Sequence, residues 1–161
     1  YPETPVTPDA PARTIADGEY TIGCANSASA VLDISGASRR AGANVQLYGS
    51  NGTAAQRFRV SYDAQTGTYE IVSACSGLAL DVHYADFSNG ANVQQYTRNG
   101  SKAQRWLITP KGDGTYTIAS AGNASLVLDA KWGGTSDGTN VQIYESNGSA
   151  AQRWKFTAAA Q

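Results

Sequence analysis

The chain has 161 residues, enough for one domain with a buried core, and 12 lysines and arginines nearly balance 13 aspartates and glutamates. No basic stripe accompanies this balance, and no apolar run approaches the roughly 18 residues that a membrane helix needs. We therefore expect neither nucleic-acid binding nor membrane insertion.

The chain opens with YPETPVTPDAPA, a stretch rich in proline and threonine that contains almost nothing to bury. Such a composition is typical of an extended linker. We assign residues 1–16 to a linker and residues 17–161 to a folded domain. We expect this domain to be one module of a larger protein that is secreted or lies at the cell surface.

The folded domain repeats itself three times at a constant spacing of 48 residues. The copies span about residues 17–62, 67–110 and 114–157, and internal repetition indicates a fold built from equivalent units. In the first copy the repeated positions are Asp33, Asn44, Gln46, Tyr48, Asn51, Gln56 and Phe58. Their counterparts are Asp81, Asn92, Gln94, Tyr96, Asn99, Gln104 and Trp106, then Asp129, Asn140, Gln142, Tyr144, Asn147, Gln152 and Trp154.

Four short segments of each copy have the composition of β-strands. In the third copy we expect strands at residues 114–119, 126–129, 140–144 and 152–156. Alternation turns Val141 and Ile143, and in the last strand Trp154 and Phe156, toward the core. Twelve short strands in three copies are too few for a typical propeller, so we predict an all-β, closed threefold structure.

An Asn-Gly pair recurs between the third and fourth strands of each copy, where a tight turn needs a positive φ. The asparagines are Asn51, Asn99 and Asn147. Two interpretations stay open for them, a role in the turn and a polar contact to a ligand.

Cys24 and Cys75 occupy unequal places in their copies, so they form no repeated metal or disulfide framework. The even count fits either one disulfide or two free thiols. The single histidine, His83, has no second His or Cys at metal-ligand spacing, and we expect no metal and no other cofactor.

Three elements recur together in every copy: L-D at 32–33, 80–81 and 128–129, V-Q-x-Y at 45–48, 93–96 and 141–144, and Q-R-[FW] at 56–58, 104–106 and 152–154. This combination resembles the pattern of ricin B-type lectins, also called family 13 carbohydrate-binding modules. The resemblance covers about residues 17–157. It implies a β-trefoil with six barrel strands, three hairpins that close one end, and one sugar site in each copy.

The resemblance also implies which side chains contact the sugar. The carboxylates that accept hydrogen bonds from neighbouring hydroxyls are Asp33, Asp81 and Asp129, which define sites one, two and three. The stacking platforms are Tyr48, Tyr96 and Tyr144, and the secondary contacts are Gln46, Gln94 and Gln142. A carboxylate has the acceptors for a vicinal diol, and a tyrosine ring offers an apolar face to a pyranose. We expect the glutamines of the Q-R-[FW] elements to bond loop backbone: Gln56, Gln104 and Gln152.

Each copy departs from the family at one position. Members that bind galactose often have asparagine directly before the Q-x-W glutamine, whereas this chain has Ala55, Ala103 and Ala151. The departure argues against strong galactose binding through that contact.

The copies differ from one another three residues after the aspartate, where Gly36, Tyr84 and Trp132 stand. We predict that Tyr84 and Trp132 give sites two and three an additional aromatic wall. The alternative is that these rings pack over the end of the barrel.

The resemblance implies a monomeric, non-catalytic module that tethers a larger protein to glycans through up to three sites. Glycans that contain galactose or N-acetylgalactosamine, including the mucin type, are the expected partners, and cell-wall glycan is the next candidate. Each site offers one recurring acid where a glycosidase needs two, so we expect no catalysis by this segment. A trefoil that serves only as a spacer or protein contact is the alternative, with structural aspartates.

Overall fold

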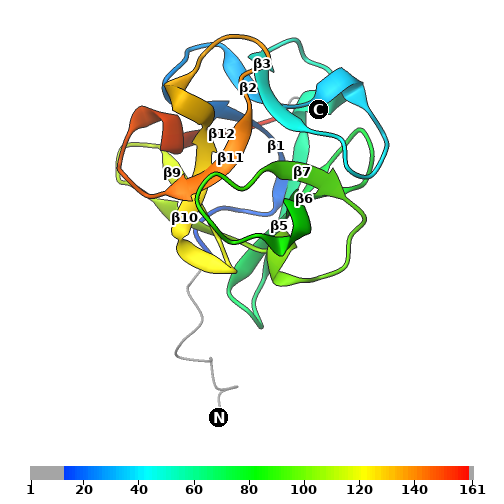
Figure 1. The fold of residues 1–161 in the computed structure, drawn as a ribbon, viewed down its shortest axis with the longest axis vertical. Coiled ribbons are helices and arrows are strands. Elements are labelled where there is room, and N and C mark those ends of the chain that lie inside the picture. Colours follow the sequence, from blue (N-terminus) through cyan, green and yellow to red (C-terminus); the bar gives the residue numbers. More distant parts are fainter. Residues whose placement is uncertain (1–12, 160–161) are drawn as a thin grey trace.

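Regular structure in residues 13–159, the part of the chain that the computed structural model describes, consists of β-strands and one-turn 3₁₀ helices (Figure 1). None of these helices is long and apolar enough to cross a membrane. Most of the predicted linker lies outside the described residues. The strands are β1 (Gly18–Cys24), β2 (Ala30–Ile34), β3 (Val45–Gly49), β4 (Phe58–Asp63), β5 (Thr68–Ser73), β6 (Ala79–Val82), β7 (Val93–Tyr96), β8 (Trp106–Pro110), β9 (Tyr116–Ser120), β10 (Asn123–Ala130), β11 (Val141–Glu145) and β12 (Trp154–Ala158). The helices are η1 (Ser35–Ala37), η2 (Ala54–Gln56), η3 (His83–Ala85), η4 (Lys102–Gln104), η5 (Lys131–Gly133) and η6 (Ala150–Gln152).

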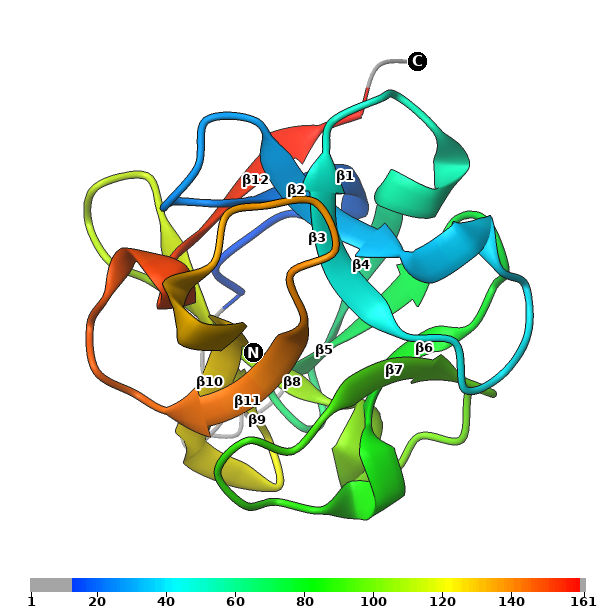
Figure 2. The same ribbon diagram turned by 45° about the horizontal axis from the view of Figure 1, so that its top comes forward.

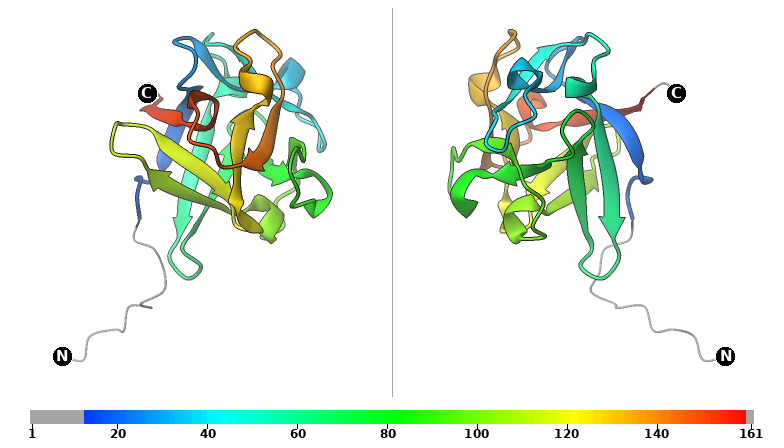
Figure 3. Two further views of the ribbon diagram at one scale, coloured as in Figure 1. Left: turned by 60° about the vertical axis from the view of Figure 1, so that its left-hand side comes forward. Right: turned by 90° about the vertical axis from the view of Figure 1, so that its right-hand side faces the viewer.

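Six strands close a barrel through antiparallel pairs. β1 pairs with β4, β4 with β5, β5 with β8, β8 with β9, β9 with β12, and β12 returns to β1. The other strands form the hairpins β2–β3, β6–β7 and β10–β11, which Figure 2 shows around a common centre. The β4–β5 hairpin extends away from β2–β3, toward the opposite end of the barrel (Figure 3). This arrangement confirms the predicted β-trefoil.

The core follows the threefold repeat because each copy turns the same alternating positions inward. Phe58, Trp106 and Trp154 are fully buried, and truncating such a ring to alanine typically costs about 3–5 kcal/mol. Phe156, predicted to face inward, is half-buried and makes T-shaped ring contacts with Tyr20 and Tyr116. The other inward positions named above, Val141 and Ile143, are fully buried.

The last strand of each copy begins two residues later than predicted. Gln152 ends η6, and β12 starts at Trp154. The reason is that the Gln152 side chain bonds the preceding loop, accepting from the Asn147 N–H at 2.8 Å and donating to the Glu145 carbonyl at 3.0 Å. The glutamine therefore ends a turn instead of continuing the barrel.

Three asparagines join the copies in a closed ring of side-chain hydrogen bonds. Asn44 Nδ2 donates to Asn140 Oδ1 at 2.7 Å, Asn140 to Asn92 at 2.9 Å, and Asn92 to Asn44 at 2.8 Å. Each amide both donates and accepts, so the ring needs all three copies to be complete. It fixes the hairpins, and with them the sites, relative to one another.

Cys24 and Cys75 are free thiols in the structure and bond different carbonyls, those of Ala150 and Ala37. Burial raises the pKa of the Cys24 thiol to about 11, so almost none of it is thiolate at pH 8. Cys75 is only partly buried. We expect iodoacetamide at pH 8 to alkylate Cys75 in the native protein and to reach Cys24 only after unfolding, as read by peptide mass spectrometry. Equal labelling of both thiols would contradict this order.

Candidate functional site

The L-D and Q-x-W elements of each copy bind one another. In the third copy Gln142 Nε2 donates to Asp129 Oδ1 at 3.0 Å, and Gln152 Nε2 donates to Asp129 Oδ2 at 2.8 Å. The Trp154 indole N–H donates to the carbonyl of Leu128, directly before the aspartate, at 3.1 Å. The carboxylate is thus held in one orientation, and each of its oxygens retains a second acceptor direction.

The other copies repeat this geometry. Asp33 accepts from Gln46 at 3.0 Å and from Gln56 at 2.9 Å, and Asp81 accepts from Gln94 at 3.1 Å and Gln104 at 2.9 Å. All three aspartates are only 5–6% exposed. Their hydrogen-bond partners in the protein are the side-chain amides of glutamines.

The turn residues use only some of their polar atoms for hydrogen bonds within the described part of the protein. Gln56, Gln104 and Gln152 bond loop backbone, as predicted. The Asn147 Oδ1 accepts from the Ser149 N–H at 2.9 Å, which is an Asx turn. The Asn147 Nδ2, by contrast, has no acceptor among residues 13–159. The turn role of the asparagine therefore leaves its NH₂ group, with two N–H donors, for a ligand.

Two hollows gather the predicted residues. The one at site three has a volume of about 720 Å³ and is lined by Asp129, Trp132, Gln142, Tyr144 and Asn147. The one at site two, about 480 Å³, is lined by Asp81, Tyr84, Gln94, Tyr96 and Asn99. Ala103 and Ala151 line these hollows as well, so the departure from the family falls inside the sites.

The aromatic walls are exposed. Tyr48, Tyr96 and Tyr144 are 41–44% exposed, whereas Tyr84 is 87% and Trp132 is 92% exposed. The alternative that Tyr84 and Trp132 pack over the barrel end is therefore wrong. Tyr84 stacks on His83 with ring centroids 3.9 Å apart, and the Lys131 ammonium lies 4.7 Å from the centre of the Trp132 ring.

The exposed rings stand on strained backbone. Tyr84 and Trp132 both have φ of +58°, a left-handed conformation that costs roughly 1–2 kcal/mol for a residue with a side chain. Gly36, their counterpart at site one, has φ of +65° and adopts it freely. Sites two and three therefore keep a large apolar ring in a position that glycine would satisfy with less strain.

Each of these loops is buttressed by a different residue of the following copy, counting the first as following the third. Asn26 Nδ2 donates to the carbonyls of Gly133 and Gly134 at site three, at 3.3 and 3.2 Å. Cys75 bonds the Ala37 carbonyl at site one. At site two the Phe87 ring fills the space beside Gly122, where an added Cβ would lie 2.3 Å from the ring.

The preceding copy also contributes to each hollow, counting the third as preceding the first. Gly42 lines the hollow of site two and donates its N–H to the Gln95 carbonyl, while Gly90 lines site three and donates to Ile143. Gly138 makes the equivalent bond to Leu47. These contacts were not predicted, although glycine recurs at 42, 90 and 138 with the 48-residue spacing and was the signal for them.

No group of three or more His, Cys, Asp or Glu side chains within residues 13–159 is placed to hold a metal ion. The hollows of sites two and three are lined by a carboxylate, side-chain amides and aromatic rings.

A known protein family and several solved structures resemble this chain. A family model described as ricin-type beta-trefoil lectin domain-like matches residues 11–96, 54–144 and 102–161. Among solved structures, the designed threefold-symmetric protein ThreeFoil is 38% identical, with a TM-score of 0.83 over 88% of this chain and 99% of that one. No curated protein sequence matches the chain.

Other solved structures also share the fold. The exo-beta-1,3-galactanase 1,3Gal43A from Clostridium thermocellum is 33% identical, with a TM-score of 0.82 over 88% of this chain but only 30% of its own length. The Macrolepiota procera ricin B-like lectin, solved in complex with lactose, is 19% identical, with a TM-score of 0.77 over 91% of this chain and 99% of the lectin. At that identity the lectin shows the fold alone.

Proposed function

The chain belongs to the ricin-type beta-trefoil lectin domain-like family, and from this premise we propose that it is a carbohydrate-binding module for galactose- or N-acetylgalactosamine-containing glycans. It binds through up to three sites, of which sites two and three are the stronger. Its role is to tether a larger, secreted or cell-surface protein to these glycans.

One observation carries the proposal: a fixed carboxylate with unused acceptor directions lies in the same hollow as exposed aromatic rings. At site three these are Asp129, Tyr144 and Trp132. A sugar presents hydroxyls along its edge and C–H groups on its faces, so an acceptor beside a ring matches both. With one recurring acid in each site, the arrangement suits recognition better than the paired carboxylates of glycoside hydrolysis.

Galactose-type sugars fit this combination because their axial 4-hydroxyl leaves one ring face largely apolar. The 33% identity to part of an exo-beta-1,3-galactanase supports the same sugar class. Alanine at 103 and 151 removes one polar contact, and the free Nδ2 of Asn99 or Asn147 supplies a donor within the same hollow.

Sites with so few polar anchors are expected to bind individually in the millimolar to high micromolar range, roughly 4–6 kcal/mol. Three sites on one rigid barrel raise avidity by about 10²–10⁴ where the glycan geometry permits simultaneous contact. The asparagine ring keeps the sites at fixed separations, which favours such contact with a repetitive glycan surface.

A glycan array with the labelled domain at high density tests the proposal. We expect signals on terminal galactose and N-acetylgalactosamine that fall sharply in the Tyr84→Gly, Trp132→Gly double variant. This double variant is a better control than replacement of the aspartates, because it leaves the buried carboxylates and their hydrogen bonds intact. Binding to glycans without these sugars would replace the assigned ligand class, and binding to no glycan would favour a protein contact or spacer.

A further inference from the structure

Among residues 13–159, the Arg105 guanidinium differs from its two counterparts in having no partner. Arg57 lies 3.5 Å from Glu19 and donates to the Gly52 carbonyl at 2.7 Å, and Arg153 donates to Asp113 at 3.1 Å. The Arg105 guanidinium has neither an ion pair nor a hydrogen bond within residues 13–159. A half-buried cation with unused donors is a recognition element for an anion.

Arg105 lacks an acidic partner in the described part of the chain because of two positions that precede the tyrosine of each copy's first strand. Tyr20, Tyr69 and Tyr116 are equivalent, because each pairs with the Phe or Trp of its Q-x-[FW] element. The residues before them read Asp17-Gly18-Glu19, Thr66-Gly67-Thr68 and Asp113-Gly114-Thr115. The second copy alone therefore lacks an acid there, and Thr66 Oγ1 bonds Thr68 Oγ1 at 2.7 Å in the place of the Asp113–Thr115 contact.

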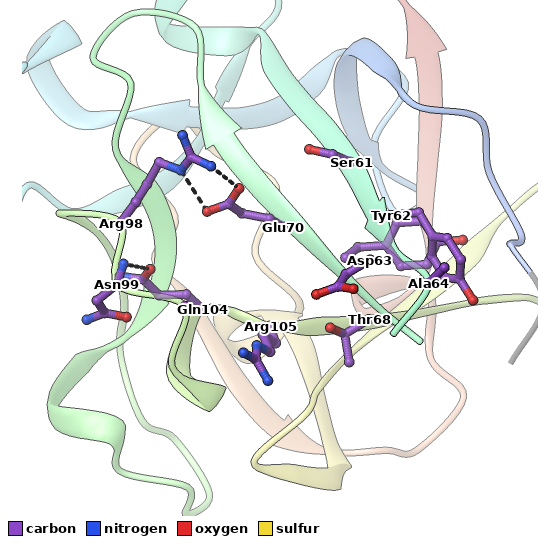
Figure 4. A pocket seen from close by; sticks show the side chains of 12 residues that line it. Ser61, Tyr62, Asp63, Ala64, Thr68, Glu70, Arg98, Asn99, Gln104 and Arg105 are labelled. Carbon is purple, nitrogen blue, oxygen red and sulfur yellow. Dashed lines mark hydrogen bonds and ion pairs between the residues drawn. The ribbon is translucent and has the colours of Figure 1, made fainter. Parts of the chain in front are cut away.

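Arg105 lines a hollow of about 780 Å³ between the β4–β5 hairpin and the loop after β7 (Figure 4). Of the other three charges of the hollow, two neutralise each other, and the third, the exposed Asp63 carboxylate, has no ion-pair partner within residues 13–159. Arg98 makes a two-point ion pair with Glu70 at 2.8 and 2.9 Å, and the Asp63 Oδ1 accepts from the Gln65 N–H. In Figure 4 Arg105 lies between the Asn99 side and Thr68, apart from the Arg98–Glu70 pair.

This hollow adjoins site two across a single loop. Asn99 lines both hollows. Ser101 and Ala103 line only the hollow of site two, whereas Gly100 and Arg105 line only the hollow beside the β4–β5 hairpin. An added Cβ at Gly100 would lie 3.9 Å from Arg105 Nη2, so bare backbone separates the guanidinium from the rim of site two. A glycan that leaves site two over Asn99 and Gly100 therefore passes beside Arg105.

We propose that Arg105 forms an anionic subsite of site two, which binds the carboxylate or sulfate of an acidic substituent on the glycan held there. The inference rests on the proposed function and refines it: site two prefers acidic galactosides, while sites one and three, whose arginines are neutralised by Glu19 and Asp113, do not.

The test compares lactose with its sialylated and sulfated derivatives, substituted at the 3′ or 6′ position. Binding to ¹⁵N-labelled protein is followed site by site through the signals of Tyr96, Tyr144 and the Arg105 Nε–H. We expect at least one acidic derivative to bind site two about 3- to 10-fold tighter than lactose, because one charge-assisted contact is added. The carboxylate and sulfate arms show which anion is preferred.

Two variants isolate the subsite. Arg105→Gln removes the cation, and Thr66→Asp supplies the internal partner that Asp113 gives Arg153. Both are expected to abolish the preference for acidic ligands while lactose affinity stays the same. Arg57→Gln, the matched control in the first copy, should retain the preference. Equal wild-type affinity for neutral and acidic ligands, or a preference that survives in Arg105→Gln, would overturn the inference.

Failure of the proposed function has a different signature. If lactose shifts none of the site signals, the galactoside assignment is wrong. The subsite is then judged by titration with inorganic sulfate, which should move the Arg105 Nε–H signal in the wild type and leave it in place in Thr66→Asp. An unmoved wild-type signal would remove the anionic subsite as well.

Discussion

Replacing Asp129 with asparagine is expected to weaken both the fold and sugar binding at site three. The carboxylate accepts from Gln142 and Gln152, and an asparagine in its place turns an NH₂ group toward one of these amide donors. Because Gln152 also secures the Asn147 turn, the buried mismatch reaches the loop as well. We expect the free energy of unfolding to fall by about 1–3 kcal/mol, the range for one unsatisfied buried group.

Urea denaturation of the variant measures this loss, with Asp86→Asn as the matched control. Asp86 is exposed, and its carboxylate accepts from the Ser88 hydroxyl, so its replacement should change stability by no more than about 0.5 kcal/mol. Titration with lactose should show site three weakened in Asp129→Asn and site two unchanged. An Asp129→Asn protein as stable as the wild type would show that the carboxylate is not part of the turn.

Each aspartate accepts two side-chain hydrogen bonds, and Asp81 and Asp129 also line the hollows of their sites, which combines the structural and the ligand-binding interpretations. A structural aspartate and a ligand-binding aspartate were alternatives, yet Asp81 holds Gln94 and Gln104 and still lines the hollow of site two. The L-D and Q-x-W elements recur together because they bond one another. Their recurrence therefore indicates the fold first, and sugar binding only through the exposed rings beside them.

The sequence predicted the number of strands and the buried rings of each copy. The alternation is a local pattern and the 48-residue spacing repeats it, so together they gave twelve strands and the three fully buried rings. The late start of β12 was missed because the bonds of the Gln152 side chain to the preceding loop override the alternating pattern.

Contacts between copies could not be predicted in this way. The asparagine ring and the Asn26 bonds to the η5 loop each depend on which residues of different copies meet. Asn26 and Gly122 occupy one equivalent position with different chemistry, so no repeat pattern marks them as buttresses. The exposure of Trp132 was likewise beyond the sequence, because a tryptophan among loop residues fits a buried lid as well as an open wall.

Replacing Trp132 with glycine is expected to separate binding from stability. Glycine relieves the strain at φ of +58°, and this gain offsets the lost Lys131 contact and the greater freedom of glycine in the unfolded chain. We expect stability to stay within about 1 kcal/mol of the wild type, because the relief of about 1–2 kcal/mol of strain is opposed by two losses of about 0.5–1 kcal/mol each. Binding at site three should fall about tenfold, because an apolar ring that is 92% exposed in the free protein no longer covers the sugar.

Site-resolved titration with lactose tests this, and the repeat supplies matched variants at the same position. Tyr84→Gly should weaken site two alone, and Gly36→Trp should strengthen site one while costing about 1–2 kcal/mol for the left-handed backbone. If Trp132→Gly binds as the wild type does, the ring is not a wall of the site. If it loses several kcal/mol of stability, the ring stabilises the fold despite its exposure, and the strain at Tyr84 and Trp132 has a structural origin.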